Sequence, residues 1–251
     1  MGNLNSKSIG EFVSENYRTA VVFQKYAIDF CCKGGRTINE VCENKKIAPG
    51  VLLADLEEAS KQDDNQGTDF QSLPLDLLAD YIETNHHKYI KEKTPALKQY
   101  LDKICKVHGN QHPELLEINE QFNASAYELA IHMKKEEFIL FPFIREMAKA
   151  ENKHEKTRQA NFGTIQNPIQ MMMADHATEG KRFERISLLS NSYSPPADAC
   201  TTYRVAYSML KEFEEDLHLH IHLENNILFP KAIAMESRVN ALKTGYLYPY
   251  L

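Results

Sequence analysis

Two stretches of the chain carry the same pair of potential metal ligands in the same setting. The stretch "HMKKEEFILFP" begins at His132 and has Glu136 four residues later, and "HIHLENNILFP" begins at His220 and has Glu224 four residues later. Residues four apart lie on one face of an α-helix, so each His is expected to project beside its Glu. Imidazole and carboxylate groups together are ligands for divalent metal ions.

Both pairs interrupt an apolar stripe of their predicted helix. The stripe residues are Leu129, Leu140 and Phe143 around the first pair, and Phe213, Leu217 and Leu228 around the second. A buried carboxylate without a partner is costly, and one shared metal site would supply a partner for both. A single His-x3-Glu pair is more often a surface ion pair, but its repetition on two apolar stripes favours metal binding.

The repeat extends towards the N-terminus by one histidine in each half. His87 lies 45 residues before His132, and His176 lies 44 residues before His220. Two helical hairpins would then supply four histidines and two glutamates. This set fits two metal ions, each bound by two imidazoles and bridged by both carboxylates, with positions left for an exogenous ligand. The ligand types suit iron or manganese better than calcium, and they do not exclude zinc.

The histidine of the first helix is ambiguous, because two are adjacent. The apolar stripe through Leu78, Ile82 and Tyr89 favours His86 over His87, and only one of the two is expected to face the metals. His218 and His222 lie on a different face from the ligand pair and are expected to face solvent or to support the ligands indirectly.

The elements that position these residues are predicted to be helices throughout. The small domain is predicted at residues 1–62, a linker at about 63–72, and a four-helix bundle at 72–236. The stretch 150–166 is expected to cross between the hairpins, and the tail after about Ser237 has no clear periodicity. The predicted bundle helices span 74–107, 113–149, 167–190 and 199–235.

Composition excludes several other classes of protein. The 251 residues carry a net charge of −6 without a basic stripe, so a nucleic-acid partner is not expected. No apolar run approaches the roughly 18 residues of a membrane span. Five cysteines, two of them adjacent, make a poor disulfide framework and indicate reduced thiols in a cytoplasm. The sequence is compatible with a homodimer.

Four motifs together carry a resemblance to a known family. They are "KYAIDFCCKGGRT", "HMKKEEFILFP", "PPADACTTY" and "HIHLENNILFP". Over residues 8–235 the chain resembles the iron–sulfur cluster repair di-iron proteins, also called the repair-of-iron-centres family. The resemblance implies an all-α fold: a hemerythrin-like four-helix bundle with a di-iron centre, preceded by a small helical domain with a Cys-Cys motif. It favours His87 over His86, and the implied ligands are His87, His132, Glu136, His176, His220 and Glu224.

The resemblance also implies a function. The chain would repair iron–sulfur clusters damaged by nitrosative or oxidative stress, by delivering iron or by reducing nitric oxide, with damaged iron–sulfur proteins as partners. Two non-haem iron ions are favoured over manganese or zinc.

The residues alone favour simple packing for Cys31 and Cys32, whereas the resemblance implies thiol transfer or redox chemistry. The alternative function is a hemerythrin-like carrier or sensor of dioxygen or nitric oxide. Whether the protein is an enzyme is left open.

Overall fold

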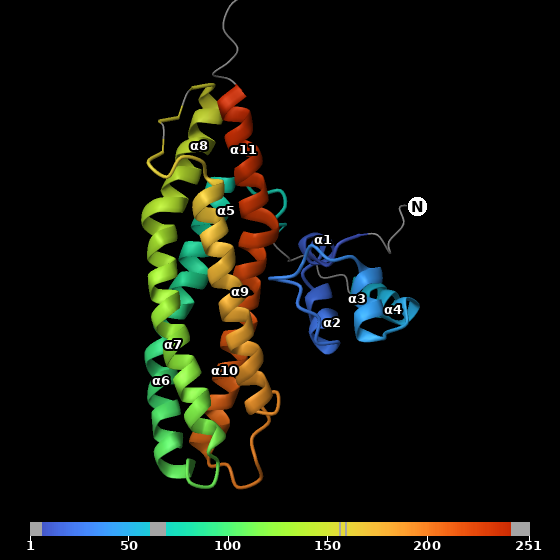
Figure 1. Cartoon of the computed structure of the whole chain (residues 1–251), viewed down its shortest axis with the longest axis vertical. Coiled ribbons are helices and arrows are strands. Elements are labelled where there is room, and N and C mark those ends of the chain that lie inside the picture. The colour runs from blue at the N-terminus through green and yellow to red at the C-terminus, as the bar shows by residue number, and fades with distance from the viewer. Residues whose placement is uncertain (1–6, 61–68, 156, 159, 242–251) are drawn as a thin grey trace, which may run out of the picture.

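The fold is described from a computed structural model that covers residues 7–60, 69–155, 157–158 and 160–241. Every regular element in these ranges is a helix, which confirms the all-α prediction. Most of the predicted linker and the last ten residues of the tail lie outside the described residues. Figure 1 shows a long bundle with a small group of helices against one side, near the middle of its length.

Four long arms form the bundle. The first arm comprises α5 (Leu75–Tyr81), η2 (Ile82–His87) and α6 (Lys88–His108). The second comprises α7 (Glu114–Lys135), η3 (Glu136–Leu140) and α8 (Phe141–Lys153). The third is α9 (Gln166–Leu189), and the fourth comprises α10 (Thr201–Leu223), η4 (Glu224–Leu228) and α11 (Phe229–Ala241). The arms match the predicted helices to within a few residues, except that the fourth continues beyond 235 because Val239 packs in the core.

The segments η2, η3 and η4 are wide, π-helical turns inside three of the arms. Such turns are often found at functional sites. Pro142 and Pro230 each lie one residue into the α-helix that follows η3 or η4. Proline has no amide N–H and crowds the carbonyl four residues earlier, so the ordinary α-helical ladder is disfavoured there. The repeated I-L-F-P phrase therefore helps to place a wide turn next to each glutamate.

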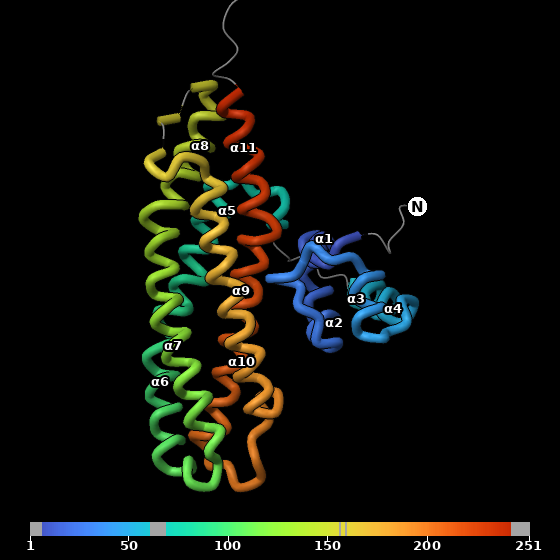
Figure 2. The backbone as a smooth tube through the Cα atoms, in the orientation of Figure 1, coloured from blue at the N-terminus to red at the C-terminus, as the bar shows by residue number. Residues whose placement is uncertain are grey.

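The N-terminal module consists of α1 (Ile9–Glu15), α2 (Thr19–Lys25), α3 (Ile38–Lys45) and α4 (Pro49–Ser60). Ser8 and Thr37 begin α1 and α3 with capping boxes, in which the hydroxyl oxygen accepts the backbone N–H of a glutamate three residues on. The loop between α2 and α3 reaches the bundle (Figure 2), where Asn226 donates to the carbonyl of Cys31. Gly34 is required at this contact, because a Cβ there would lie 2.6 Å from the backbone oxygen of Phe30 as well as 2.6 Å from Asn226 Oδ1.

Two hydrophobic clusters fill the molecule. One joins the N-terminal module to α6, α7, α9 and α10, and the other joins α5 and α8 to η4 and α11. In each arm, the residues predicted to bind metal lie near the point in the sequence where residues of one cluster give way to residues of the other. Each cluster therefore fixes one side of the layer that holds the polar residues.

Candidate metal centre

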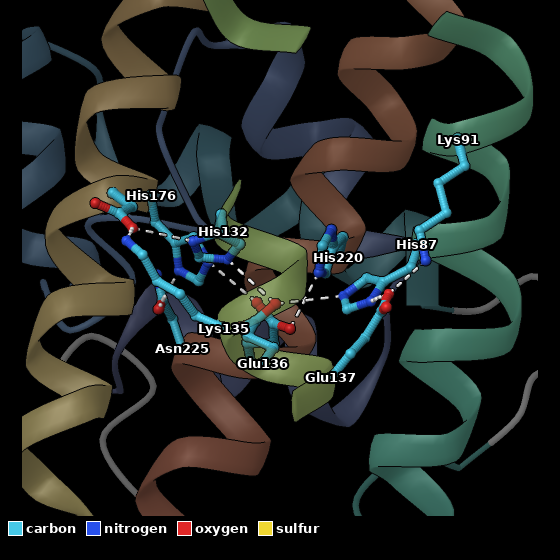
Figure 3. Close-up of polar contacts among 11 residues, drawn as sticks. His87, Lys91, His132, Lys135, Glu136, Glu137, His176, His220 and Asn225 are labelled. Atoms are coloured by element: carbon cyan, nitrogen blue, oxygen red, sulfur yellow. Dashed lines mark hydrogen bonds and ion pairs between the residues drawn. The ribbon is translucent and has the colours of Figure 1, made fainter. Parts of the chain in front are cut away.

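All six residues predicted as metal ligands come together in the middle of the bundle. Figure 3 shows imidazoles from separate arms directed towards the carboxylate of Glu136. The six residues are buried, each with at most 2% of its surface exposed. The six residues are His87, His132, Glu136, His176, His220 and Glu224.

The six residues form two overlapping groups that share both glutamates. One group pairs His87 with His220, and the other pairs His132 with His176. In each group, one potential ligand atom from every residue lies within 4.8 Å of the others. This is the arrangement expected of two adjacent ions bridged by Glu136 and Glu224.

The distances within the second group suit one ion. The Nε2 atoms of His132 and His176 are 3.0 Å apart, His132 Nε2 is 3.2 Å from Glu136 Oε2, and His176 Nε2 is 3.1 Å from Glu224 Oε2. Nitrogen and oxygen ligands at bonds of about 2.1 Å lie about 3.0–3.4 Å from each other around one ion.

The first group has similar spacings. His220 Nε2 is 3.0 Å from Glu224 Oε1, and His87 Nε2 is 3.3 Å from Glu136 Oε2. Its donor atoms therefore lie at separations that a second ion could bridge.

Several buried polar atoms here have no hydrogen-bond partner among the described residues. Glu136 Oε1 is one of them, and Glu136 Oε2 and Glu224 Oε2 meet only imidazole nitrogens, at 3.1–3.3 Å, whose charge depends on a proton on the ring. A buried carboxylate left without compensation destabilises a fold strongly, so these atoms require a partner. A bound cation supplies that partner, and the donor set fits one.

Electrostatics keeps both glutamates ionised. Burial and the charge of Glu224 act to raise the pKa of Glu136, but the surrounding histidines outweigh them and lower it. Burial likewise opposes ionisation of Glu224, yet His220 and His176 hold its pKa well below the usual range. Burial acts to lower the pKa of His132, but the charge of Glu136 prevails and raises it to about 10. The Glu136 carboxylate also raises the pKa of His87 despite its burial, whereas burial lowers the pKa of His220. In the metal-free site, protons on His87 and His132 therefore balance part of the negative charge of the two glutamates.

Three of the four histidines are oriented by a partner on Nδ1. His87 Nδ1 contacts Glu137 Oε1 at 2.8 Å, and His132 Nδ1 contacts Asp175 Oδ2 at 3.3 Å. His176 Nδ1 contacts Asn225 Oδ1 at 2.8 Å (Figure 3). An acceptor on Nδ1 fixes the tautomer in which Nε2 carries the free lone pair, which is the usual arrangement of a metal-binding histidine.

These partners were not predicted from the sequence. Glu137 and Asp175 are each adjacent to a predicted ligand, which is the one local signal they carry. Each contacts a histidine of another arm, so the pairing depends on how the arms pack. Two lysines, Lys91 and Lys135, also contact these carboxylates.

The structure separates the adjacent histidines of the first arm. His87 belongs to the cluster, whereas His86 Nδ1 contacts Asp216 Oδ1 at 2.9 Å and its ring stacks on that of His220. The reason is the wide turn η2. A π-turn returns to the same face after five residues instead of four, so the face of Ile82 continues at His87.

The expectation that His218 and His222 face solvent or support the ligands is wrong for His222. His222 is fully buried against the N-terminal module, where its ring lies 5.9 Å from that of Phe30. Its Nδ1 contacts Asn226, and its Nε2 lies 3.3 Å from Ser14 Oγ. Sequence periodicity found that this face differs from the ligand face but could not show that another module covers it.

The predicted cysteine pair lies beside the metal centre. Cys31 is buried, Cys32 is half-buried, and their sulfur atoms are 3.7 Å apart. The Cys32 thiol donates to the backbone carbonyl of His176 at 3.4 Å. The carbonyl of Cys31 accepts from the side-chain amide of Asn225, the same residue that contacts His176 Nδ1.

Among the described residues, no helix is both long enough and apolar enough to cross a membrane.

Known proteins resemble the chain over nearly its whole length. A family model described as the hemerythrin HHE cation-binding domain matches residues 78–232, and one described as a domain of unknown function, DUF542, matches residues 5–60. The iron–sulfur cluster repair protein ScdA of Staphylococcus haemolyticus is 32% identical over 228 residues, which cover 90% of this chain and 98% of that protein. The iron–sulfur cluster repair protein YtfE of Escherichia coli is 32% identical over 228 residues, which cover 91% of this chain and 97% of that protein. The chain therefore belongs to the family of these iron–sulfur cluster repair proteins, and its bundle is a hemerythrin-type cation-binding domain.

Proposed function

We propose that the chain repairs damaged iron–sulfur clusters and that its bundle holds two iron ions for this purpose. The observation that carries the proposal is the buried centre in which Glu136 and Glu224 are each shared by two pairs of histidines. Relatives that share about nine-tenths of the chain are named cluster repair proteins, which supports the same reading.

The ligands of the two ions are assigned to the six residues of the centre. His87 and His220 would hold one ion, His132 and His176 the other, and the two glutamates would bridge them. Imidazole and carboxylate ligands suit iron and manganese, and this set has no thiolate to favour zinc. When bound, the irons supply either iron for delivery to a client or the electrons that reduce nitric oxide.

Cys31 and Cys32 are proposed to take part in transfer between the centre and the client. Cys32 is half-buried and lies at the bundle surface next to His176. A thiolate at this position could receive iron or a nitrosyl group, since reactivity requires access as well as ionisation.

The cytoplasm is the proposed location. All five cysteines are free thiols in the structure, which suits a reducing compartment. The proposed clients are iron–sulfur proteins damaged by nitric oxide or by oxidants, and both agents belong to the stress conditions in which repair is needed.

The stoichiometry of the centre is the first test. Anaerobic loading with iron(II), followed by removal of excess metal and metal analysis, is expected to give two irons per chain. Glu136→Gln removes one shared carboxylate and is expected to lower the metal content of both groups, because both use Glu136. Saturation of the unaltered chain at one iron would contradict the dinuclear centre.

Repair itself is tested with a damaged client. An iron–sulfur enzyme inactivated by nitric oxide is incubated with the iron-loaded chain, with the metal-free chain, and with free iron(II) at equal concentration. The iron-loaded chain is expected to restore activity faster than free iron does. If free iron restored activity equally fast, the chain would only store iron and would not act in repair.

A hemerythrin-like carrier or sensor is the second candidate, and the match of the bundle to the hemerythrin model favours it. This function predicts reversible binding of dioxygen or nitric oxide to the iron-loaded chain without recovery of the client. Repair predicts recovery of the client, so the same assay separates the two functions.

A further inference from the structure

A second group of potential metal ligands lies outside the bundle centre, in the loop between α2 and α3. It consists of Asp29, Cys31 and Cys32, whose ligand atoms lie within 4.8 Å of one another. The two sulfur atoms are 3.7 Å apart, and Cys31 Sγ is 3.4 Å from Asp29 Oδ1. Two thiols and one carboxylate are thus gathered at a single point.

These separations match the edges of a tetrahedral metal site. Two thiolates bound at about 2.3 Å to a tetrahedral ion lie about 3.8 Å apart, and a thiolate and a carboxylate oxygen lie about 3.6 Å apart. The observed distances differ from these by a few tenths of an ångström at most. Adjacent cysteines seldom form a disulfide with each other, because an unstrained bridge needs well-separated Cα atoms. Shared ligation uses the pair without that strain.

The loop is held in this conformation by its own backbone contacts. Asp29 Oδ1 accepts the backbone N–H groups of Cys32 at 2.9 Å and of Lys33 at 3.4 Å. Arg36 donates to the Asp29 carbonyl at 3.1 Å. An ion would therefore meet a group of ligands that is already arranged, which lowers the cost of binding.

The bundle fixes the other side of the loop. The side-chain amides of Asn225 and Asn226 each donate to the Cys31 carbonyl at 3.2 Å. Asn225 also contacts His176 Nδ1, and the Cys32 thiol donates to the His176 carbonyl. The loop cluster thus contacts His176, a predicted ligand of the bundle centre, directly at its backbone carbonyl and indirectly through Asn225.

We propose that Asp29, Cys31 and Cys32 form a second cation site, for one exchangeable thiophilic divalent ion such as iron(II) or zinc(II), which is bound less tightly than the two irons of the bundle and is lost when excess metal is removed. Solvent or a group of the client would complete the tetrahedron on the half-exposed side of Cys32. On binding, each thiol loses its proton to solvent and the ion gains two sulfur ligands. The use of this site for iron moving between the bundle and a client rests on the proposed repair function, whereas the site itself does not.

In the metal-free loop, the neutral thiols act as hydrogen-bond donors. As described, each S–H donates a hydrogen bond, from Cys31 to Asp29 and from Cys32 to His176. The contact with Cys32 and burial raise the pKa of the Cys31 thiol, so the metal-free loop is stable with that proton in place. Metal binding must therefore displace both thiol protons and the hydrogen bonds that they make.

Cobalt(II) is the probe, because cobalt bound by thiolate has an intense charge-transfer band in the near ultraviolet, whereas cobalt bound by nitrogen and oxygen does not. The full chain is reduced, loaded with iron(II) in the bundle under argon, and titrated with cobalt. We expect the band to saturate at one thiolate-bound cobalt per chain. Cys31→Ser combined with Cys32→Ser is expected to abolish the band.

Asp29→Asn tests the third ligand with little change in shape. The amide oxygen still accepts the Cys32 N–H, so the loop is kept while the charged ligand is lost. The apparent affinity for cobalt is expected to fall at least tenfold. Cys200→Ser is the matched control, because Cys200 is an exposed thiol 3.2 Å from His108 Nε2 that could also bind cobalt. Its band is expected to equal that of the unaltered chain.

The outcomes are distinct. Absence of the band in the unaltered chain, its loss in Cys200→Ser, or its survival in the double serine variant would overturn the loop site. An unchanged affinity in Asp29→Asn would overturn the three-ligand assignment. Circular dichroism and bundle iron content establish that each variant is folded. A chain that binds cobalt in the loop but restores no client would overturn the repair function alone.

Discussion

At the scale of single residues, the centre depends on groups that never touch the metal as well as on those that would. Glu137, Asp175 and Asn225 each contact the Nδ1 atom of a predicted ligand. Two of the three are carboxylates, which make a histidine more basic and hold its ring in place. They determine which ring nitrogen faces the centre.

Asp175→Asn is predicted to weaken metal binding about 10–100-fold, because the loss of such a carboxylate partner typically costs this much. The neighbouring His132 would lose the charged group that orients it, although it would still be present as a ligand. The measurement is a titration of iron(II) against a chelator. Asp198→Asn is the control, since Asp198 also contacts a histidine, His112, but does so outside the centre. An equal loss in both variants would point to a general charge effect.

The two adjacent histidines of η2 give a second prediction. His87→Ala is expected to reduce the iron content from two towards one, because its group in the centre loses one of two imidazoles. His86→Ala removes a ring that stacks on His220 and contacts Asp216, so it is expected to keep two irons bound more weakly. Metal analysis at saturation distinguishes them. Loss of iron only in His86→Ala would reverse the assignment.

At the scale of helices, the wide turns explain what the sequence could and could not predict. The repeated phrase predicted His132, Glu136, His220 and Glu224 as ligands, because in both copies the His-Glu pair interrupts an apolar stripe, and the structure brings these four residues together. In the first arm, α-helical periodicity favoured His86. The wide turn η2 adds one residue to the turn and moves the inward face from position 86 to position 87. The resemblance to the repair family favoured His87 from its motif alone, without knowledge of the wide turn.

The helix α10 also contains a half-buried titratable group away from the centre. Burial raises the pKa of Glu214 to about 7. In the unfolded chain this carboxyl ionises near its ordinary value, so between roughly pH 4.5 and 7 the folded state binds more protons than the unfolded state. The free energy of unfolding therefore falls as the pH rises through this window and levels off above it.

Glu214→Gln is predicted to stabilise the metal-free chain by about 1–3 kcal/mol at pH 8, an estimate from the size of the pKa shift. The gain is expected to shrink towards zero at pH 5, where the carboxyl is already protonated in the folded state. Denaturant unfolding at both pH values gives the comparison. Glu212→Gln, at an exposed position of the same helix, is expected to show no such pH dependence. A gain of equal size at both pH values would rule out this mechanism.

At the scale of the whole molecule, the N-terminal module and the bundle share one hydrophobic cluster and a polar contact next to the centre. Asn225 connects the Cys31 carbonyl to His176 through its two ends. Periodicity could assign each module its helices, but no local pattern shows that His222 and the asparagines after Glu224 lie beneath the cysteine loop. Which residues of the fourth arm lie beneath the cysteine loop is determined by the packing of the two modules against each other.

The arrangement predicts a division of labour between these parts. Cys31 contacts Asn225 through its backbone carbonyl, and Cys32 contacts His176 through a backbone carbonyl, so neither thiol contacts an imidazole nitrogen of the centre in the described contacts. Cys31→Ser combined with Cys32→Ser keeps those backbone groups. The double variant is therefore expected to hold two irons with an unchanged absorption spectrum while losing most of its rate of client repair.

The double change is the appropriate test, because adjacent thiols can replace each other in transfer. Cys200→Ser serves as the control, since it removes one exposed thiol of the bundle, and it is expected to repair at the normal rate. Both readouts are made on the same iron-loaded samples. Full repair by the double variant would show that the two cysteines have only a packing role. Loss of both iron and repair activity would mean that a sulfur atom supports the bundle centre directly. The reason is that serine keeps the backbone contacts of the loop and nearly the size of its side chains, and changes only their chemistry.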